Sequence, residues 1–131
     1  MGKLEFYAMG GLGNVAKTAG QTVRTEVWAT NTGASSGIWT VSYDFEDDAG
    51  RTPVKDPYTV VTIAPGQTVK VVDDTRTIPP GYEGGSYRLV VYWGNGNIPP
   101  GGVLPYFQAQ NWWLSIGAGA GIFNVSSANV T

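Results

Sequence analysis

Cysteine and histidine are both absent from this chain of 131 residues. Their absence excludes disulfides, zinc sites built from Cys and His, thiol nucleophiles and every general base that depends on His. A Ser–His–Asp triad is impossible, so an enzyme would have to rely on carboxylates, Lys or Tyr. No acid–base constellation of that kind is recognisable in the sequence, which therefore predicts a protein that is not an enzyme.

Charge is scarce as well. Only 14% of the residues are charged, whereas about 25% is typical of soluble domains. The 8 basic and 10 acidic residues are scattered, so no basic stripe is present to neutralise nucleic-acid phosphates. No apolar run approaches the ~18 residues of a membrane-spanning helix, and the opening segment MGKLEFYAMG has no secretory hydrophobic region. We therefore expect neither a nucleic-acid partner nor membrane insertion.

Turn-forming residues, by contrast, are abundant. The 19 Gly and 8 Pro divide the chain into short, β-branched runs in which apolar and polar residues alternate, a pattern typical of an all-β sandwich or barrel. The length suits one domain. The sequence therefore predicts a single antiparallel β-sandwich over residues 1–131, with about seven to nine strands. The expected strands are Leu4–Met9, Thr22–Thr30, Ile38–Phe45, Tyr58–Ile63, Thr68–Ile78, Ser86–Trp93, and one or two closing strands within 112–130.

The alternation also predicts which aromatic side chains enter the core. In the third expected strand, Trp39 and Tyr43 fall on the apolar face, and sandwich cores commonly hold a buried Trp at this place. In the sixth, Tyr87 and Trp93 share the apolar face. Trp28 differs, because its neighbours at the strand period are charged. We expect it on the outer side of its sheet.

Three segments carry a family resemblance. ATNTG (29–33) closes the second expected strand, IAPGQT (63–68) joins the fourth to the fifth, and GGSYRLVV (84–91) leads into the sixth. Together they resemble the bacterial Ig-like modules often called CARDB-like adhesion domains, over roughly residues 20–93. The resemblance implies an Ig-like sandwich that serves as a spacer, adhesion or assembly module on an exterior surface, without catalytic residues.

The chain departs from that pattern after Trp93, where a tight hairpin between strands F and G is expected. Instead, residues 94–110 precede the segment NWW. Loops longer than ~12–15 residues are commonly functional, so we expect a long aromatic F–G loop at the functional site. The candidate binding or assembly residues, all of them aromatic, are Trp28, Tyr92, Tyr106, Phe107, Trp112 and Trp113.

Three interpretations of these rings are open. The rings can anchor a neighbouring subunit, since Trp and Tyr dominate interface energetics. They can stack on sugar rings, as in a carbohydrate-binding module, while nearby Asn and Gln bond to sugar hydroxyls. The loop can also fold back and bury its own rings as a satellite cluster.

Acidic residues cluster in the segment DFEDDAG, at Asp44, Glu46, Asp47 and Asp48. Such density suits Ca²⁺, which takes six to eight oxygen ligands, although the EF-hand spacing is missing. The alternative is a hairpin turn in which Gly50 adopts a positive φ. A second acidic pair, Asp73 and Asp74, lies in the middle of an expected strand, where charge deters pairing with other copies. No cofactor other than calcium is indicated.

The sequence thus predicts a non-catalytic structural or assembly module on an exterior surface. Two settings fit: a virion exterior or capsid decoration protein, and a cell-surface adhesion module. The expected localisation is extracellular, on a cell surface or on a virion surface. The expected partners are other copies of the chain, in a homo-oligomer formed through the aromatic loop, or neighbouring structural subunits. The alternative is a carbohydrate-binding module whose exposed Trp and Tyr bind glycans.

Overall fold

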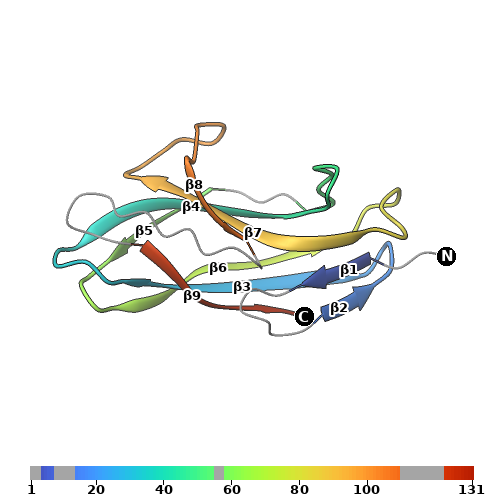
Figure 1. The fold of residues 1–131 in the computed structure, drawn as a ribbon, viewed down its shortest axis with the longest axis horizontal. Helices are drawn as coiled ribbons and strands as arrows, with labels where there is room; N and C mark the ends of the chain where they lie inside the picture. The colour runs from blue at the N-terminus through green and yellow to red at the C-terminus, as the bar shows by residue number, and fades with distance from the viewer. Residues whose placement is uncertain (1–3, 8–13, 55–57, 110–122) are drawn as a thin grey trace.

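A computed structural model describes residues 4–7, 14–54, 58–109 and 123–131, and these form strands, turns and loops without a helix. It follows that no helix in this part of the chain is long and apolar enough to cross a membrane. The strands, labelled in Figure 1, are β1 (Leu4–Tyr7), β2 (Asn14–Lys17), β3 (Thr22–Asn31), β4 (Gly37–Glu46), β5 (Thr59–Ile63), β6 (Thr68–Thr77), β7 (Ser86–Asn95), β8 (Tyr106–Ala109) and β9 (Phe123–Val130).

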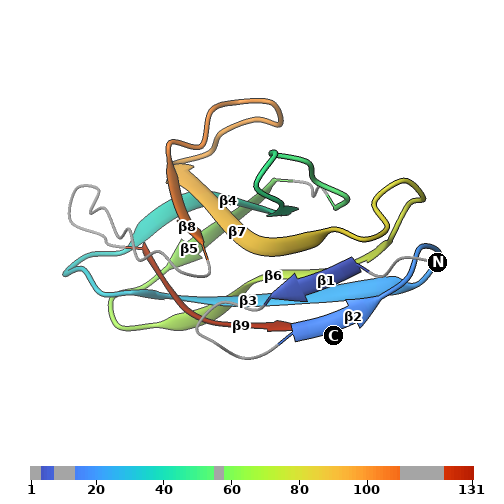
Figure 2. The same cartoon turned by 45° about the vertical axis from the view of Figure 1, so that its right-hand side comes forward.

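The strands form two sheets that face each other as two layers (Figures 1 and 2). One sheet has the order β2-β1-β7-β4-β5, and β8 pairs with β7 beyond the segment that β1 occupies. The other has the order β6-β3-β9. Every pairing is antiparallel except that of β1 with β7. This all-β, two-layer arrangement fits the predicted β-sandwich.

The core lies between the layers and is filled by the predicted aromatic side chains. Trp39, Tyr43, Tyr87 and Trp93 are all at most 2% exposed, which confirms the core positions derived from strand alternation. Aliphatic side chains of β3, β4 and β7 fill the space around them. Burying this much apolar surface is the main favourable contribution to folding.

The facing strand β3 alternates as expected, with a buried residue at every second position from Val23 to Ala29. Its partner β6 contains a β-bulge, because Val27 pairs with Val72 while Trp28 pairs with Lys70. The extra residue, Val71, is buried, as is Val72. The bulge therefore lets two consecutive valines of β6 enter the core.

The turn after β3 is fixed by one buried amide, Asn31, in the ATNTG segment. Its side-chain Nδ2 donates to the carbonyl oxygens of Ser35 (2.8 Å) and Ile63 (2.9 Å), and its Oδ1 accepts from the Gly33 amide. A single side chain therefore connects the β3–β4 turn to the end of β5, and satisfies backbone groups that strand pairing leaves open.

The predicted strands are confirmed, with ends shifted by one or two residues where the structure describes them. The expected closing strand at 112–119 lies outside the described residues. The sequence pattern does not predict the two four-residue strands β2 and β8. Strand β8 lies within the segment expected as a long aromatic loop, so the connection after β7 is only residues 96–105. Tyr106 and Phe107 are therefore strand residues, held by pairing with β7.

We expect Gly37→Ala to lower the free energy of unfolding by about 1–3 kcal/mol, the usual cost of overpacking a core. A Cβ at Gly37 would lie 2.2 Å from Cη2 of Trp39. Phenylalanine lacks these outer ring atoms, so Gly37→Ala should cost less in a Trp39→Phe background. Urea denaturation of the wild type, both single variants and the double variant measures the difference. If Gly37→Ala lowered the free energy of unfolding equally in the wild type and in Trp39→Phe, the result would contradict this close contact.

Candidate functional site

The outer face of the β8-β7-β4 layer carries side chains brought together by strand register. Residues directly opposite each other on neighbouring strands point to the same side of a sheet. On β7, every second residue from Arg88 points outward, and its partners on β4 and β8 point the same way. The outward pairs that matter here are Glu46 with Arg88, Val90 with Ala109, and Tyr92 with Phe107.

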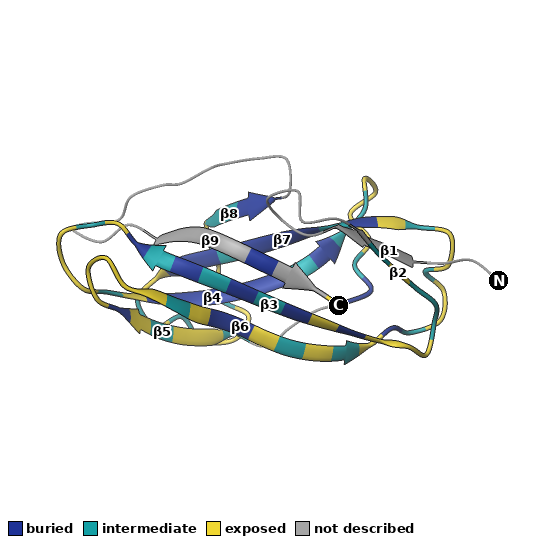
Figure 3. Ribbon diagram, turned by 90° about the horizontal axis from the view of Figure 1, so that it is seen from below, coloured by how far each residue is buried: buried dark blue, intermediate teal, exposed yellow. Residues whose placement is uncertain are grey.

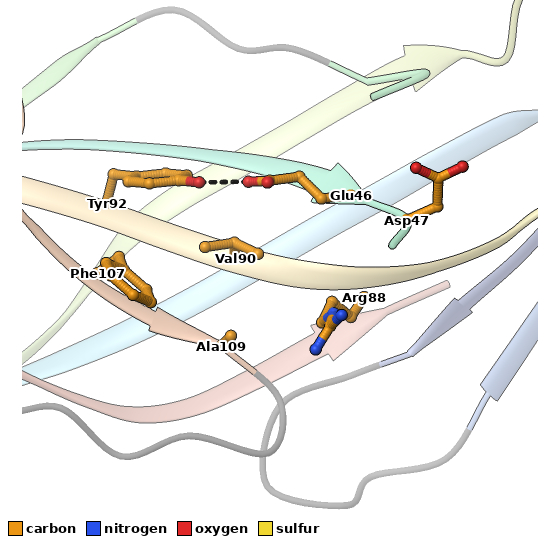
Figure 4. A pocket seen from close by; sticks show the side chains of 7 residues that line it. All are labelled: Glu46, Asp47, Arg88, Val90, Tyr92, Phe107 and Ala109. Atoms are coloured by element: carbon orange, nitrogen blue, oxygen red, sulfur yellow. Dashed lines mark hydrogen bonds between the residues drawn. The ribbon is translucent and has the colours of Figure 1, made fainter. Parts of the chain in front are cut away.

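These side chains surround an open pocket of about 330 Å³ (Figure 4). Val90 and Ala109 lie low in it, with only 5% and 7% of their surfaces exposed. The rings of Tyr92 and Phe107 meet at one end, with centroids 6.1 Å apart. Polar groups stand at the other end, so the pocket has an apolar floor and a charged rim. The described residues that line it are Glu46, Asp47, Arg88, Val90, Tyr92, Phe107 and Ala109.

Tyr92 connects the two ends of the pocket. Its hydroxyl donates to Oε2 of Glu46, which lies on the neighbouring strand (Figure 4). Burial raises the pKa of the Tyr92 phenol well above its usual range, and the hydrogen bond to Glu46 and the nearby carboxylate of Asp44 add to the shift. The tyrosine is therefore held neutral, as the donor that orients Glu46.

The charged rim combines both signs. Arg88 donates from a terminal nitrogen to Oδ1 of Asp48 at 2.7 Å, but the Asp48 side chain is 99% exposed. Such a solvent-exposed ion pair contributes little stability, so it opens at little cost. The Asp47 side chain stabilises the turn after β4. Its carboxylate accepts hydrogen bonds from the Ala49 and Arg51 amides and from the Arg51 guanidinium.

The β7–β8 loop is held at one end of the same sheet (Figure 2). The Thr40 hydroxyl, on the outer side of β4, donates to the Gly96 carbonyl (2.7 Å) and accepts from the Ile98 amide (2.8 Å). The Tyr58 hydroxyl donates to the Gly102 carbonyl at 2.6 Å. These bonds fix the path of the loop, and hence the point at which β8 begins and presents Phe107.

The six aromatic candidates do not form one surface. Of those that the structure describes, only Tyr92 and Phe107 meet in the pocket. Tyr106 points inward and packs against Trp93, with ring centroids 6.2 Å apart. Trp28 lies on the other sheet, on the polar outer face predicted for it, with Lys70 Nζ 5.2 Å from its ring centroid. Trp112 and Trp113 lie outside the described residues.

The calcium hypothesis for Asp44, Glu46, Asp47 and Asp48 finds no support. Within the described ranges, no group of three or more acidic side chains could hold a metal ion. The partners described above explain why: Glu46 accepts from a tyrosine, Asp47 organises the turn, and Asp48 pairs with an arginine. The alternative, a hairpin turn, describes this segment better, and Gly50 has the positive φ of 78° that it requires.

The sequence reasoning missed three pocket residues, Arg88, Val90 and Ala109. The signal for the first two was present, because strand alternation that sends Tyr87 and Trp93 inward sends Arg88, Val90 and Tyr92 outward together. No comparable signal identified Ala109. Its position follows from the pairing of β8 with β7, and β8 is too short to be recognised from its own pattern.

A second feature of this sheet face lies at its other end. In the described part of the chain, the exposed large hydrophobic residues are Ile38, Val60 and Val103, which are 51%, 45% and 81% exposed. Ile38 is on β4, Val60 is on the neighbouring β5, and Val103 is in the loop that Tyr58 and Thr40 hold beside them. The three therefore belong to one region, which we call the β5 end.

In the pocket, the Tyr92 hydroxyl lies beside the Glu46 carboxylate. The β5 end presents exposed apolar side chains instead. Comparisons with protein-family models, with curated proteins and with solved structures give no match. Function is therefore inferred from the geometry of the chain alone.

Tyr92→Phe is expected to lower the free energy of unfolding by about 1 kcal/mol near neutral pH, since it removes the hydroxyl that donates to Glu46. The variant also removes a group whose pKa is raised by folding. Because folding raises this pKa, the neutral phenol of Tyr92 stabilises the folded state. This stabilisation is complete below about pH 10, where an unfolded tyrosine is neutral, and it is lost as the pH rises toward the pKa of Tyr92 in the folded state. Urea denaturation at increasing alkaline pH should show a steeper loss for the wild type. If the unfolding free energies of the wild type and Tyr92→Phe fell in parallel as the pH rises, the result would contradict a neutral, buried Tyr92.

Thr40→Val should loosen the β7–β8 loop, because it removes the hydroxyl that bonds to the backbone at Gly96 and Ile98. We expect faster amide hydrogen exchange at Ile98 and a loss of about 1–2 kcal/mol in unfolding free energy. Thr75→Val, at an exposed position of β6, is the matched control and should change neither. Unchanged exchange at Ile98 in Thr40→Val would show that other contacts hold the loop.

Proposed function

We propose that the chain is a non-catalytic structural module that assembles with other copies of itself on an exterior surface. The observation that carries this proposal is the contrast between two sheet edges. The edge strand β6 is charged along its length, whereas the edge strand β5 of the other sheet has no charge and lies beside exposed apolar side chains. Figure 3 shows exposed residues along both strands.

Strand β5 is the last strand of its sheet in the order β2-β1-β7-β4-β5. Its five residues, TVVTI, are all β-branched, and none is charged or proline. Among the described residues its only partner is β4, so within these ranges no strand pairs with its other edge. An uncharged, β-branched edge of this kind is a ready template for another strand.

Strand β6 is an edge strand too, in the sheet β6-β3-β9, but it is protected. Asp73 pairs with Arg24 at 3.0 Å and with Lys70 at 3.4 Å, and Asp74 accepts from Arg76 at 2.8 Å. A second copy that approached this edge would have to displace or bury these charges. This contrast supports the expected role of Asp73 and Asp74 in deterring pairing, and favours β5 over β6 as the edge for assembly.

The partner that fits the β5 edge is a second copy of the same strand. Two identical edges can pair antiparallel around a two-fold axis. Because β5 has no charge, this pairing brings no like charges together. Ile38 and Val60 on the outer face, with Val103 of the loop, extend the contact beyond the backbone, and exposed apolar groups gathered in one region mark interaction sites. The loop thus contributes through Val103 rather than through its flanking rings.

An Ig-like arrangement, which we also propose, is supported by three features. In an Ig-like sandwich, the second, third, fifth and sixth expected strands take the places of strands B, C, E and F. Strands B and E pair, as β3 and β6, and strands C and F pair, as β4 and β7. Trp39 on strand C is buried. The Tyr87 hydroxyl, at the start of strand F, donates to the Tyr82 carbonyl at 3.3 Å, which is the pattern of a tyrosine corner.

The proposed setting is a virion exterior or a cell surface, where neighbouring copies form a layer or a stalk. Low charge and the absence of Cys and His agree with a chain that acts through packing and not through chemistry. A sandwich whose β6 edge is charged and whose β5 edge is not favours one of these two edges for association. That property suits ordered assembly better than non-specific aggregation.

Thr62→Lys tests this proposal directly. Thr62 is an exposed, outward-facing residue of β5, and two copies paired through β5 would bring the introduced charges together. We expect the native mass, measured by light scattering, to be that of a multimer for the wild type and of a monomer for Thr62→Lys. Thr75→Lys makes the same change on the protected edge β6 and should leave the multimer intact.

Two results would overturn assembly through β5. One is a monomeric wild type at every concentration tested. The other is dissociation by Thr75→Lys but not by Thr62→Lys. Thermal unfolding of both variants checks that each retains its fold, since an exposed substitution should change stability by no more than about 0.5 kcal/mol.

A further inference from the structure

We propose that the pocket between β4, β7 and β8 binds one pyranose ring, as a free sugar or as the terminal residue of a glycan. The residues that carry the inference are Glu46, Arg88, Tyr92 and Phe107, with Val90 and Ala109 beneath the ligand. The carbohydrate-binding alternative predicted from the sequence used exposed Trp and Tyr. Of its aromatic candidates, this pocket contains Tyr92 and Phe107.

The apolar side of the pocket matches one face of a sugar ring. A pyranose presents axial C–H groups on its face and hydroxyls on its edge, so it needs a flat apolar support. Phe107, Val90 and Ala109 provide that support, and the Tyr92 ring adjoins Phe107 at one end. The volume of about 330 Å³ lies at the small end of the range for ligand pockets, which suits a single ring.

The polar side matches the hydroxyl edge. The Tyr92 hydroxyl engages Oε2 of Glu46, and Oε1 has no hydrogen-bond partner in the described part of the structure, so it can accept from a sugar hydroxyl. Arg88 is directly opposite Glu46 in the strand register and can donate to the adjacent hydroxyl. Its present partner, the almost fully exposed Asp48, is easily replaced. Hydrogen bonds to charged groups are the stronger kind.

The mixture of charges also disfavours small ligands that carry charge of a single sign. An organic cation would be attracted to the rings and to Glu46, but Arg88 lines the same pocket and opposes it. An anion would be attracted to Arg88, but Glu46 and Asp47 oppose it. A neutral ligand that both donates and accepts uses every group without leaving one unpaired. A neutral sugar has this chemistry.

The inference does not rest on assembly through β5. Glu46 and Ile38 are at opposite ends of β4, eight positions apart in the numbering, which is about 26 Å along a strand. The two surfaces can therefore be occupied together, and a module that assembles through one end remains free to bind at the other.

The test is a titration of the complete chain with the methyl glycosides of glucose, galactose, mannose and N-acetylglucosamine, at millimolar concentrations. Side-chain NMR signals of Val90, Tyr92 and Phe107 report on the pocket. We expect saturable shifts with at least one sugar, and none with choline chloride or sodium phosphate. A glycoprotein that ends in the sugar which binds, compared with the free sugar, distinguishes the two sources of the ring.

Phe107→Ala removes the aromatic part of the apolar support and should weaken binding of that sugar by about tenfold or more. Arg88→Gln, which leaves the apolar floor in place, should weaken it similarly and covers the case in which Phe107→Ala impairs folding. Val103→Ala, in the loop, is the control and should bind normally. Thr62→Lys should also bind normally while its native mass changes, which separates failure of this inference from failure of assembly.

Three outcomes would overturn the inference. The first is the absence of a saturable shift with all four glycosides. The second is saturable binding of choline or phosphate at the same signals, which would assign the pocket to a charged ligand. The third is unchanged sugar affinity in folded Phe107→Ala and Arg88→Gln, which would place the sugar elsewhere.

Discussion

The pairing of β4 with β7 is the interaction on which the rest of the structure depends. Its register runs from Trp39 opposite Asn95 to Glu46 opposite Arg88. The inner side of this pair supplies the largest side chains of the core, among them Trp39 and Trp93. Its outer side supplies most of the pocket and, through Thr40, the anchor of the β7–β8 loop. A shift of one residue would send each of these sets to the wrong face.

Around this central pair, the two ends of one sheet face acquire different properties. At one end, β8 continues the sheet and closes a pocket whose rim has charges of both signs. At the other, β5 ends the sheet with neither charge nor, among the described residues, a partner. The opposite sheet has ion pairs on its outer face and on its β6 edge. Charge therefore distinguishes the β6 edge from the β5 edge.

Much of the fold could be predicted from the sequence because strand alternation is a local property. The long strands and the buried positions of Trp39, Tyr87 and Trp93 follow from the period of two and from turn residues. The site could not be predicted in the same way. Its residues come from three strands, and their proximity depends on register, which no local pattern encodes. Phe107 illustrates the difference, because its role depends on the short strand β8, whereas its sequence neighbours indicate a loop. The acidic turn was also ambiguous, since the same carboxylates serve a metal or a hairpin until their partners are known.

We propose a module in which the β6 edge is protected, the β5 edge is open to pairing, and the pocket is separate from both. The central claim of this proposal is that copies meet through the backbone of β5. Amide hydrogen exchange over a dilution series tests this most directly, because it reports on individual strands. The account predicts that the outward amides of β5 are protected at high concentration and exchange quickly on dilution, while β6 is unchanged. Rapid exchange of β5 at every concentration, or concentration-dependent protection of β6 instead, would contradict it.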